Sequence, residues 1–169
     1  MTDSTLEYWM RGPVEGITPY LQPVAHALLQ ARKEVNELVV DFPEDKLWIK
    51  PEGLASVGFH LQHLRGVLDR LFTYARNETL TEEKLQQLRL EGIPSTQSVP
   101  DLLFAFNQQV DTALTQLRET STDELLMHRG IGRKQIPSNV LGLLFHAAEH
   151  TMRHTGQLLV TVKIQGSSQ

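Results

Sequence analysis

Hydrophobic positions at helical spacing divide the chain into four long amphipathic segments. The first two cover residues 18–40 and residues from about 54 to 76, and the other two cover residues 98–119 and 138–163. Within each segment the apolar residues recur every three or four positions, so they form one stripe along a helix. The pattern therefore predicts four long helices.

Proline and capping residues mark where helices begin and end. Pro43 cannot continue a helix, so the first segment ends before it. A short charged segment at 81–91 begins with Thr81, which is a good N-cap residue. Ser98 and Asp101 have the spacing of a capping box, with aspartate in place of the usual glutamate. These signals predict an additional short helix inside the connection between the second and third long helices.

The connections that flank the third helix are long. About 20 residues separate the second helix from the third, and residues 120–137 separate the third from the fourth. A turn at residues 129–133, flanked by short extended stretches, predicts a small hairpin in the second connection. A plain up-down-up-down bundle uses shorter loops. We therefore expect one all-α domain over residues 1–169, a four-helix bundle with long crossover connections.

Charge and composition exclude several classes of partner. The chain has 16 Lys and Arg against 20 Asp and Glu, a net charge of −4, which argues against non-specific nucleic-acid binding. No apolar run approaches the roughly 18 to 20 residues that cross a bilayer, and the N-terminal sequence lacks signal-peptide features. Cysteine is absent, which excludes disulfides and thiolate ligands. We expect a cytoplasmic protein whose chemistry depends on its seven histidines.

Three of these histidines are spaced four residues apart on the last helix. His146, His150 and His154 each lie one turn from the next and about 40° around the axis. Imidazoles one turn apart can both reach a single ion at about 2.0 to 2.1 Å. Ordinary core or surface histidines are the alternative, but burying several imidazoles without partners is costly. The spacing therefore favours a metal site, with His146 and Gln157 on its outer flank.

A third ligand has to come from another helix, and the second helix offers His60 and His63. Periodicity favours His60, which lies about 60° from the centre of the apolar stripe, over His63 at about 120°. The pattern alone leaves both open. Glu-x-x-His pairs, which di-iron carboxylate sites require, do not occur, and neither does a Gly-x-Ser-x-Gly sequence.

Residues 56–66 (SVGFHLQHLRG) and 150–157 (HTMRHTGQ) resemble the DinB-like superfamily of DNA-damage-inducible and YfiT-type metalloenzymes. The resemblance implies a four-helix bundle with a long crossover, usually a homodimer, and a three-histidine site for a divalent metal, commonly zinc or nickel. In that family one ligand follows a Ser or Thr by seven residues, which from Ser56 indicates His63. The resemblance thus implies the metal ligands His63, His150 and His154, with His60 as the competitor of His63.

A three-histidine site leaves a coordination position open for water or a thiolate, as in catalytic zinc sites. The resemblance implies a metal-dependent enzyme that acts on a small molecule, by transfer from a low-molecular-weight thiol or by hydrolysis. His146, Gln157 and His60 are the candidate pocket residues. A non-catalytic metal-binding stress-response protein is the alternative. Phe104 widens the apolar stripe of the third helix, which favours a homodimer.

Overall fold

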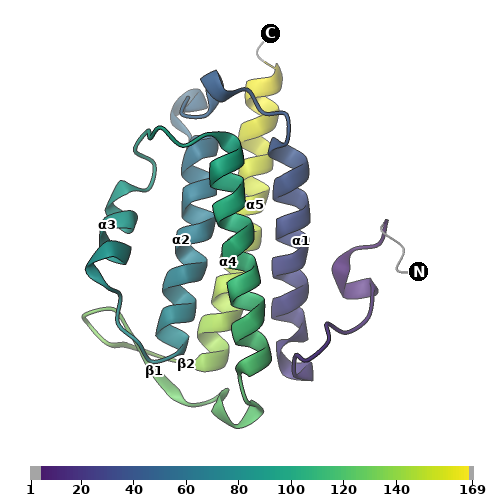
Figure 1. Ribbon diagram of the computed structural model, residues 1–169, viewed down its shortest axis with the longest axis vertical. Coiled ribbons are helices and arrows are strands. Elements are labelled where there is room, and N and C mark those ends of the chain that lie inside the picture. Colours follow the sequence, from purple (N-terminus) through teal and green to yellow (C-terminus); the bar gives the residue numbers. More distant parts are fainter. Residues whose placement is uncertain (1–4, 168–169) are drawn as a thin grey trace.

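Four long helices form a bundle in the computed structural model, which describes residues 5–167 (Figure 1). The ends of the predicted 1–169 domain, residues 1–4 and 168–169, lie outside the described residues. The bundle helices are α1 (Gln22–Val39), α2 (Val57–Ala75), α4 (Val99–Glu119) and α5 (Val140–Ser167). The predicted all-α four-helix bundle is confirmed.

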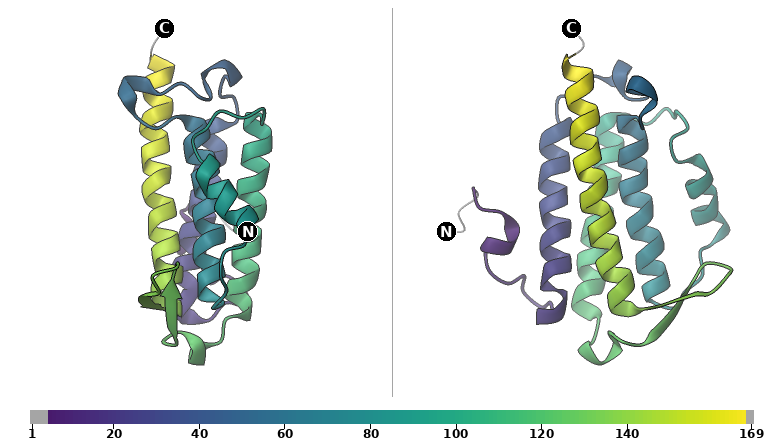
Figure 2. Two further views of the ribbon diagram at one scale, coloured as in Figure 1. Left: turned by 90° about the vertical axis from the view of Figure 1, so that its left-hand side faces the viewer. Right: turned by 180° about the vertical axis from the view of Figure 1, so that it is seen from behind.

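The long crossover is also present. Helices α1 and α5 run in one direction and α2 and α4 in the other, so the chain must return along the whole bundle between α2 and α4 (Figure 1). Residues 76–98 make this return and carry the short helix α3 (Glu82–Leu90), which lies outside α2. Seen from behind, α5 lies between α1 and α2 (Figure 2). We call residues 76–98 the crossover.

Local capping fixes the starts of three helices. The hydroxyl oxygen of Ser56 accepts a hydrogen bond from the backbone N–H of Phe59 at 3.1 Å, which starts α2. Thr81 caps α3, as predicted, and Ser98 caps α4 in a complete capping box with Asp101. Capping satisfies backbone N–H groups that have no partner inside the helix.

Three helices start later than the sequence predicts, and one of them is α2, which begins at Val57 rather than at about residue 54 because Ser56 is its N-cap. Residues 19–21 form a 3-10 turn, so α1 begins at Gln22 rather than at residue 18. The predicted hairpin is present as β1 (His128–Ile131) paired antiparallel with β2 (Ile136–Asn139), but its turn lies at residues 132–135 and not at the predicted 129–133, because residues 129–131 pair in β1. Because residues 138 and 139 belong to β2, α5 begins at Val140, where the side-chain oxygen of Asn139 accepts from the N–H of Gly142 at 2.7 Å.

The core lies along the axis of the bundle, where the apolar stripes of all four long helices meet. Its largest fully buried side chains include Leu28 from α1, Phe72 from α2, Phe106 from α4 and Leu144 from α5. Within residues 5–167, no helix combines the length and the hydropathy that crossing a bilayer requires. On the side where α2 faces α5, this apolar packing gives way to histidines.

Candidate metal centre

His63, His150 and His154 come together between α2 and α5. Each offers one ring nitrogen, and the three nitrogens lie within 4.8 Å of one another. The Nε2 atoms of His63 and His150 are 2.9 Å apart. All three side chains are half-buried. The structure thus brings together the three histidines that the family resemblance implies; we call them the histidine triad.

Helix geometry and aromatic packing set the orientation of the rings. His150 and His154 lie one turn apart on α5, with ring centroids separated by 4.6 Å. The N-cap at Ser56 fixes where α2 begins and so which side of α2 carries His63. The ring of Phe59 stacks on the ring of His63, with centroids 5.2 Å apart and planes 12° from parallel. The His63 ring is therefore held on both its face and its edges.

The edge contact comes from the end of α3. His63 donates a hydrogen bond from Nδ1 to the Oε2 atom of Glu91 at 2.7 Å, and Arg70 forms an ion pair with Oε1 of the same carboxylate. The side chain of Glu91 is only 9% exposed. Placing the proton on Nδ1 leaves the lone pair on Nε2, which faces His150. A carboxylate in this position orients a ligating imidazole and raises its basicity.

Glu91 stays ionised despite its burial. Burial by itself raises the pKa of this carboxyl, but the hydrogen bonds from His63 and Arg70 outweigh that effect and hold the pKa below its ordinary value. The negative charge is therefore available next to His63 at neutral pH.

Two residues of α2 permit this contact: Gly66 leaves space for Glu91, and Gln62 binds the crossover. A methyl group on Gly66, in the middle of α2, would collide with the Oε1 atom of Glu91 and the guanidinium of Arg70. Glycine inside a helix costs about 0.5 to 1 kcal/mol relative to alanine, and here it opens the path from Glu91 to His63. The Oε1 atom of Gln62 accepts a hydrogen bond from the N–H of Gly92 at 2.8 Å, which holds the crossover against α2.

His60 lies behind the triad. Its side chain is buried, at 2% exposure, and its Nδ1 atom is 3.3 Å from the Nδ1 atom of His154. Burial, and after it the charge of His63, lowers the pKa of His60 to about 4. The periodicity that favoured His60 reflects its depth in the core. The contact with His60 also leaves Nε2 as the atom of His154 that has no hydrogen-bond partner among residues 5–167.

The sequence matches the DinB superfamily over residues 27–158, which is most of the chain. The chain belongs to the DinB superfamily. A solved structure of a conserved protein from Enterococcus faecalis is similar, with a TM-score of 0.69 and 16% sequence identity over 85% of this chain and 95% of that one. At this identity the likeness concerns the fold. No curated protein matches the sequence.

The donor set of this DinB-superfamily chain suits a divalent transition metal. Burial first, and then the neighbouring histidines, lower the pKa of His154 to about 4, and burial likewise lowers the pKa of His150. Both imidazoles are therefore neutral at pH 7 and keep the lone pair that a metal needs. The Nδ1 atom of His150 is buried and has no hydrogen-bond partner among the described residues. Imidazole nitrogens are common ligands of divalent transition metals.

His146 and Gln157, the predicted pocket residues on the flank of α5, border two different cavities. His146 is exposed, 3.7 Å from a carboxylate oxygen of Glu149, and lines a cavity of about 610 Å³. Gln157 lines a second cavity of about 420 Å³, together with His60 and Arg153. The triad lies along α5 between the residues that border these two cavities.

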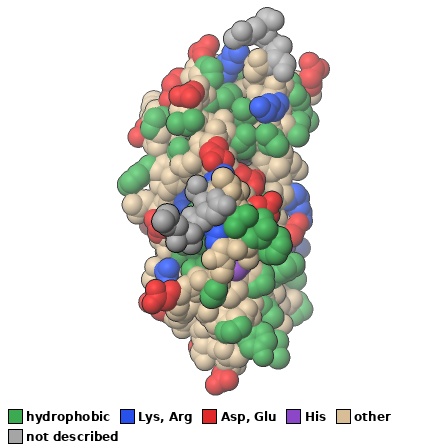
Figure 3. Space-filling model, turned by 90° about the vertical axis from the view of Figure 1, so that its right-hand side faces the viewer, with side chains coloured by type: hydrophobic (Ala, Val, Ile, Leu, Met, Phe, Trp, Pro, Cys, Tyr) green, Lys and Arg blue, Asp and Glu red, His purple; other side chains and the backbone are tan. Residues whose placement is uncertain are grey.

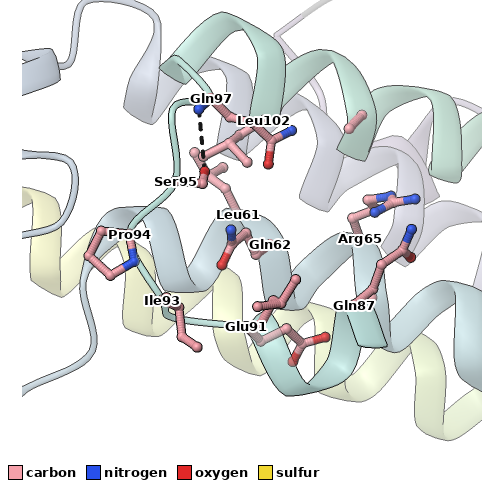
Figure 4. A pocket seen from close by; sticks show the side chains of 13 residues that line it. Leu61, Gln62, Arg65, Gln87, Glu91, Ile93, Pro94, Ser95, Gln97 and Leu102 are labelled. Atoms are coloured by element: carbon pink, nitrogen blue, oxygen red, sulfur yellow. Dashed lines mark hydrogen bonds between the residues drawn. The ribbon is translucent and has the colours of Figure 1, made fainter. Parts of the chain in front are cut away.

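A smaller cavity of about 180 Å³ lies on the outer side of Glu91 (Figure 4). It is enclosed by α2, the crossover and the start of α4, with Gln62, Arg65 and Gln87 among its lining residues. None of the triad histidines lines it. Because Glu91 lines this cavity, there is free space next to its side chain.

The sequence analysis missed Glu91 and Arg70. Glu91 is 28 residues from His63, and nothing in the local pattern of a charged helix end singles it out. The one available signal was Gly66, a glycine in the interior of a strongly patterned helix.

Proposed function

We propose that the protein is a metal-dependent enzyme that acts on a small molecule and holds one divalent ion, zinc or nickel, on His63, His150 and His154. The observation that carries this proposal is the convergence of three ring nitrogens within 4.8 Å. When bound to three imidazoles, such an ion keeps an open position and acts as a Lewis acid that acidifies water or activates a thiol.

The surrounding residues orient the ligands. Glu91 holds a proton on the Nδ1 atom of His63, and Arg70 holds the carboxylate in place. The contact with His60 turns the Nδ1 atom of His154 inward. Phe59 covers one face of His63 and excludes water from it. These contacts restrain the ligands before an ion arrives, which lowers the cost of binding.

The reaction that we favour is transfer of a low-molecular-weight thiol to a small molecule, with hydrolysis as the second possibility. Both rely on activation by the ion rather than by a protein base. Glu91, the acidic residue that contacts the triad directly, is already engaged by His63 and Arg70, so it is not free to accept a proton from a substrate. The absence of cysteine fits a reducing cytoplasm, which is the compartment that we propose.

Elemental analysis of protein purified without a histidine tag tests this proposal. The protein is then stripped with a chelator, reloaded with zinc or nickel, and assayed with glutathione and cysteine for transfer to a bimane electrophile. We expect about one ion per chain and activity that returns only with metal, while circular dichroism shows the helices in both states. Loss of the helices on metal removal, without activity in the loaded protein, would favour the non-catalytic metal-binding alternative.

We also propose a homodimer. Phe104, which the sequence analysis placed on a second apolar face, is 65% exposed on α4, and Phe145 on α5 is 60% exposed. Large exposed aromatic side chains favour an interface. Sedimentation at micromolar concentration should show twice the 19.2 kDa mass of the chain. A single species of 19.2 kDa contradicts the dimer.

A small molecule suits the surface better than a nucleic acid. On the face shown in Figure 3, Lys and Arg side chains are scattered among Asp and Glu rather than gathered. Nucleic-acid binding needs a concentrated positive field. This observation and the net charge of −4 support the absence of a nucleic-acid partner.

A further inference from the structure

The cavity of about 610 Å³ is enclosed by α2, α3, the hairpin and α5. Its size is within the range of small-molecule sites. Figure 2 shows the hairpin and α3 on the same side of α2. Val67 and His146, which both line the cavity, lie one helical turn from His63 and His150 respectively. The cavity therefore begins beside the triad; we call it the hairpin cavity.

The walls of the hairpin cavity are apolar. Val67 and Leu71 contribute from α2, and Leu85 and Leu88 contribute from α3. Leu88 is 41% exposed, so its side chain is only partly covered by protein. An apolar ligand group that fills this space removes apolar surface from water, which favours binding.

Charge in the hairpin cavity is unevenly compensated. Arg70 is neutralised by Glu91, and Glu78 is neutralised by Arg76, whose Nη2 atom lies 2.8 Å from its carboxylate. Arg133, by contrast, has no hydrogen bond or ion pair with any other described residue. In the part of the chain that the structure describes, one positive charge of this cavity thus has no counter-ion.

A tyrosine hydroxyl also lines the hairpin cavity, beside the backbone of the hairpin turn. The Tyr74 side chain lines the same cavity and has no hydrogen bond within residues 5–167. Its Oη atom is 3.9 Å from the position of a Cβ atom on Gly132, the residue before Arg133. A cation and an O–H donor that line the same cavity can bind an acidic head group through charge-assisted hydrogen bonds.

We propose that the hairpin cavity binds the substrate and that the substrate is an amphipathic organic anion. Its acidic group lies at Arg133 and Tyr74, its apolar body lies against the α2 and α3 side chains, and its far end points to His146 and the triad. This inference rests on the proposed function for the role of the triad, but the binding site itself does not require a metal.

The test uses anilinonaphthalene sulfonate, a fluorescent amphipathic anion, as the probe. It is displaced in turn by octanoate, octanol and octylammonium, which share a chain and differ in charge. We expect the probe to bind at one saturable site. Octanoate should displace it at a concentration at least about tenfold lower than octanol or octylammonium requires, because only octanoate pairs with Arg133. No saturable site, or equal displacement by octylammonium, overturns the inference.

Matched variants locate the site. Arg133→Ala should weaken octanoate binding by about five- to tenfold and leave octanol binding unchanged. Lys134→Ala is the control, because Lys134 is also an exposed cation of the hairpin turn but does not line the cavity. Leu88→Ser should weaken all three ligands, whereas Leu126→Ser, at an exposed position outside the cavity, should weaken none. Equal effects of Arg133→Ala and Lys134→Ala overturn the inference.

Measuring metal content on the same samples separates this inference from the proposed function. If the protein prefers octanoate but binds no ion at the triad, the anion site in the hairpin cavity is supported and the proposed metal-dependent function is refuted. If the protein binds one ion per chain but shows no preference among the three ligands, the anion site is refuted and the proposed metal-dependent function is unaffected.

Discussion

The α5 histidine pair and the crossover reach the same centre by different physical routes. His150 and His154 are placed by helix geometry alone, since a spacing of four residues puts both rings on one side of α5. Glu91 reaches His63 only because the crossover folds back along α2, where Gly66 leaves space and Gln62 binds the backbone of Gly92. The positions of the two proposed ligands on α5 therefore follow from local sequence, whereas the contact of Glu91 with the proposed ligand on α2 depends on tertiary structure.

The largest expected effect is the loss of a triad ligand. His63→Ala, His150→Ala or His154→Ala should each lower the affinity for zinc by more than the 10- to 100-fold that is typical for a supporting residue. Equilibrium dialysis followed by elemental analysis measures this. His60→Ala is the comparison, because His60 contacts His154 but lies outside the triad. Full occupancy in His63→Ala with loss in His60→Ala would show that His60 is the ligand on α2.

The stability of the metal-free protein should depend on pH through the buried histidines. The pKa of His60 is about 4 in the fold against an ordinary value of 6.5, so at intermediate pH the unfolded chain binds more protons. The free energy of unfolding should therefore rise from pH 4 to about 6.5 and level off above that. His60 contributes at most about 3 kcal/mol of this change.

Urea denaturation at a series of pH values measures that dependence. His60→Gln should flatten the curve without removing it, because the pKa of His154 is also about 4. An identical pH dependence in the variant and the natural protein would contradict the burial of a neutral His60.

Removing the charge of Glu91 tests the contribution of the crossover. Glu91→Gln keeps the size of the side chain and an acceptor for the Nδ1 proton of His63, but it loses the negative charge and leaves Arg70 without its partner. We expect zinc affinity to fall by about 10- to 100-fold, measured by competition with a chelator, with unchanged helix content. Unchanged affinity would mean that Glu91 only holds the crossover in place.

Gly66→Ala tests the same contact from the opposite side. The added methyl group displaces the carboxylate of Glu91 from His63, and the cavity of about 180 Å³ beside Glu91 can take the displaced side chain (Figure 4). Affinity should fall toward that of Glu91→Gln. Gly166→Ala is the control, since a methyl group there meets no atom within 4 Å. Equal affinities in the two alanine variants would contradict the role assigned to Gly66.

The smallest expected effect comes from Gln62→Ala. This change removes the acceptor for the N–H of Gly92 and loosens the crossover next to Glu91. One net hydrogen bond amounts to about 0.5 to 1.5 kcal/mol, so we expect zinc affinity to fall only a few-fold. Gln87→Ala is the control, because the side chain of Gln87 lines the same small cavity but forms no hydrogen bond with the described residues. A loss as large as that of Glu91→Gln would mean that the whole crossover detaches.

The sequence was sufficient for the elements whose causes are local. Apolar spacing predicted the four long helices, and the side chains of Thr81 and Ser98 predicted two helix starts. It was wrong by four residues at the start of α1, where a 3-10 turn forms first, and by two at the start of α5, where residues 138 and 139 pair in β2.

The candidate site was predictable only in part for the same reason. The α5 pair follows from spacing, but the choice between His60 and His63 needed the family resemblance. The two residues lie about one turn apart on α2: His60 is buried in the core, whereas His63 reaches the centre that it shares with His150 and His154. Glu91, Arg70 and the cavity around Arg133 depend on how the crossover and hairpin pack on the bundle. No periodic pattern encodes those contacts.

A crystal structure of the zinc-loaded protein tests the central claim most directly. We expect one ion at about 2.0 to 2.1 Å from the Nε2 atoms of His63, His150 and His154, with Glu91 still accepting a hydrogen bond from the Nδ1 atom of His63. An ion bound by His60 in place of His63, or coordinated directly by Glu91, would contradict it.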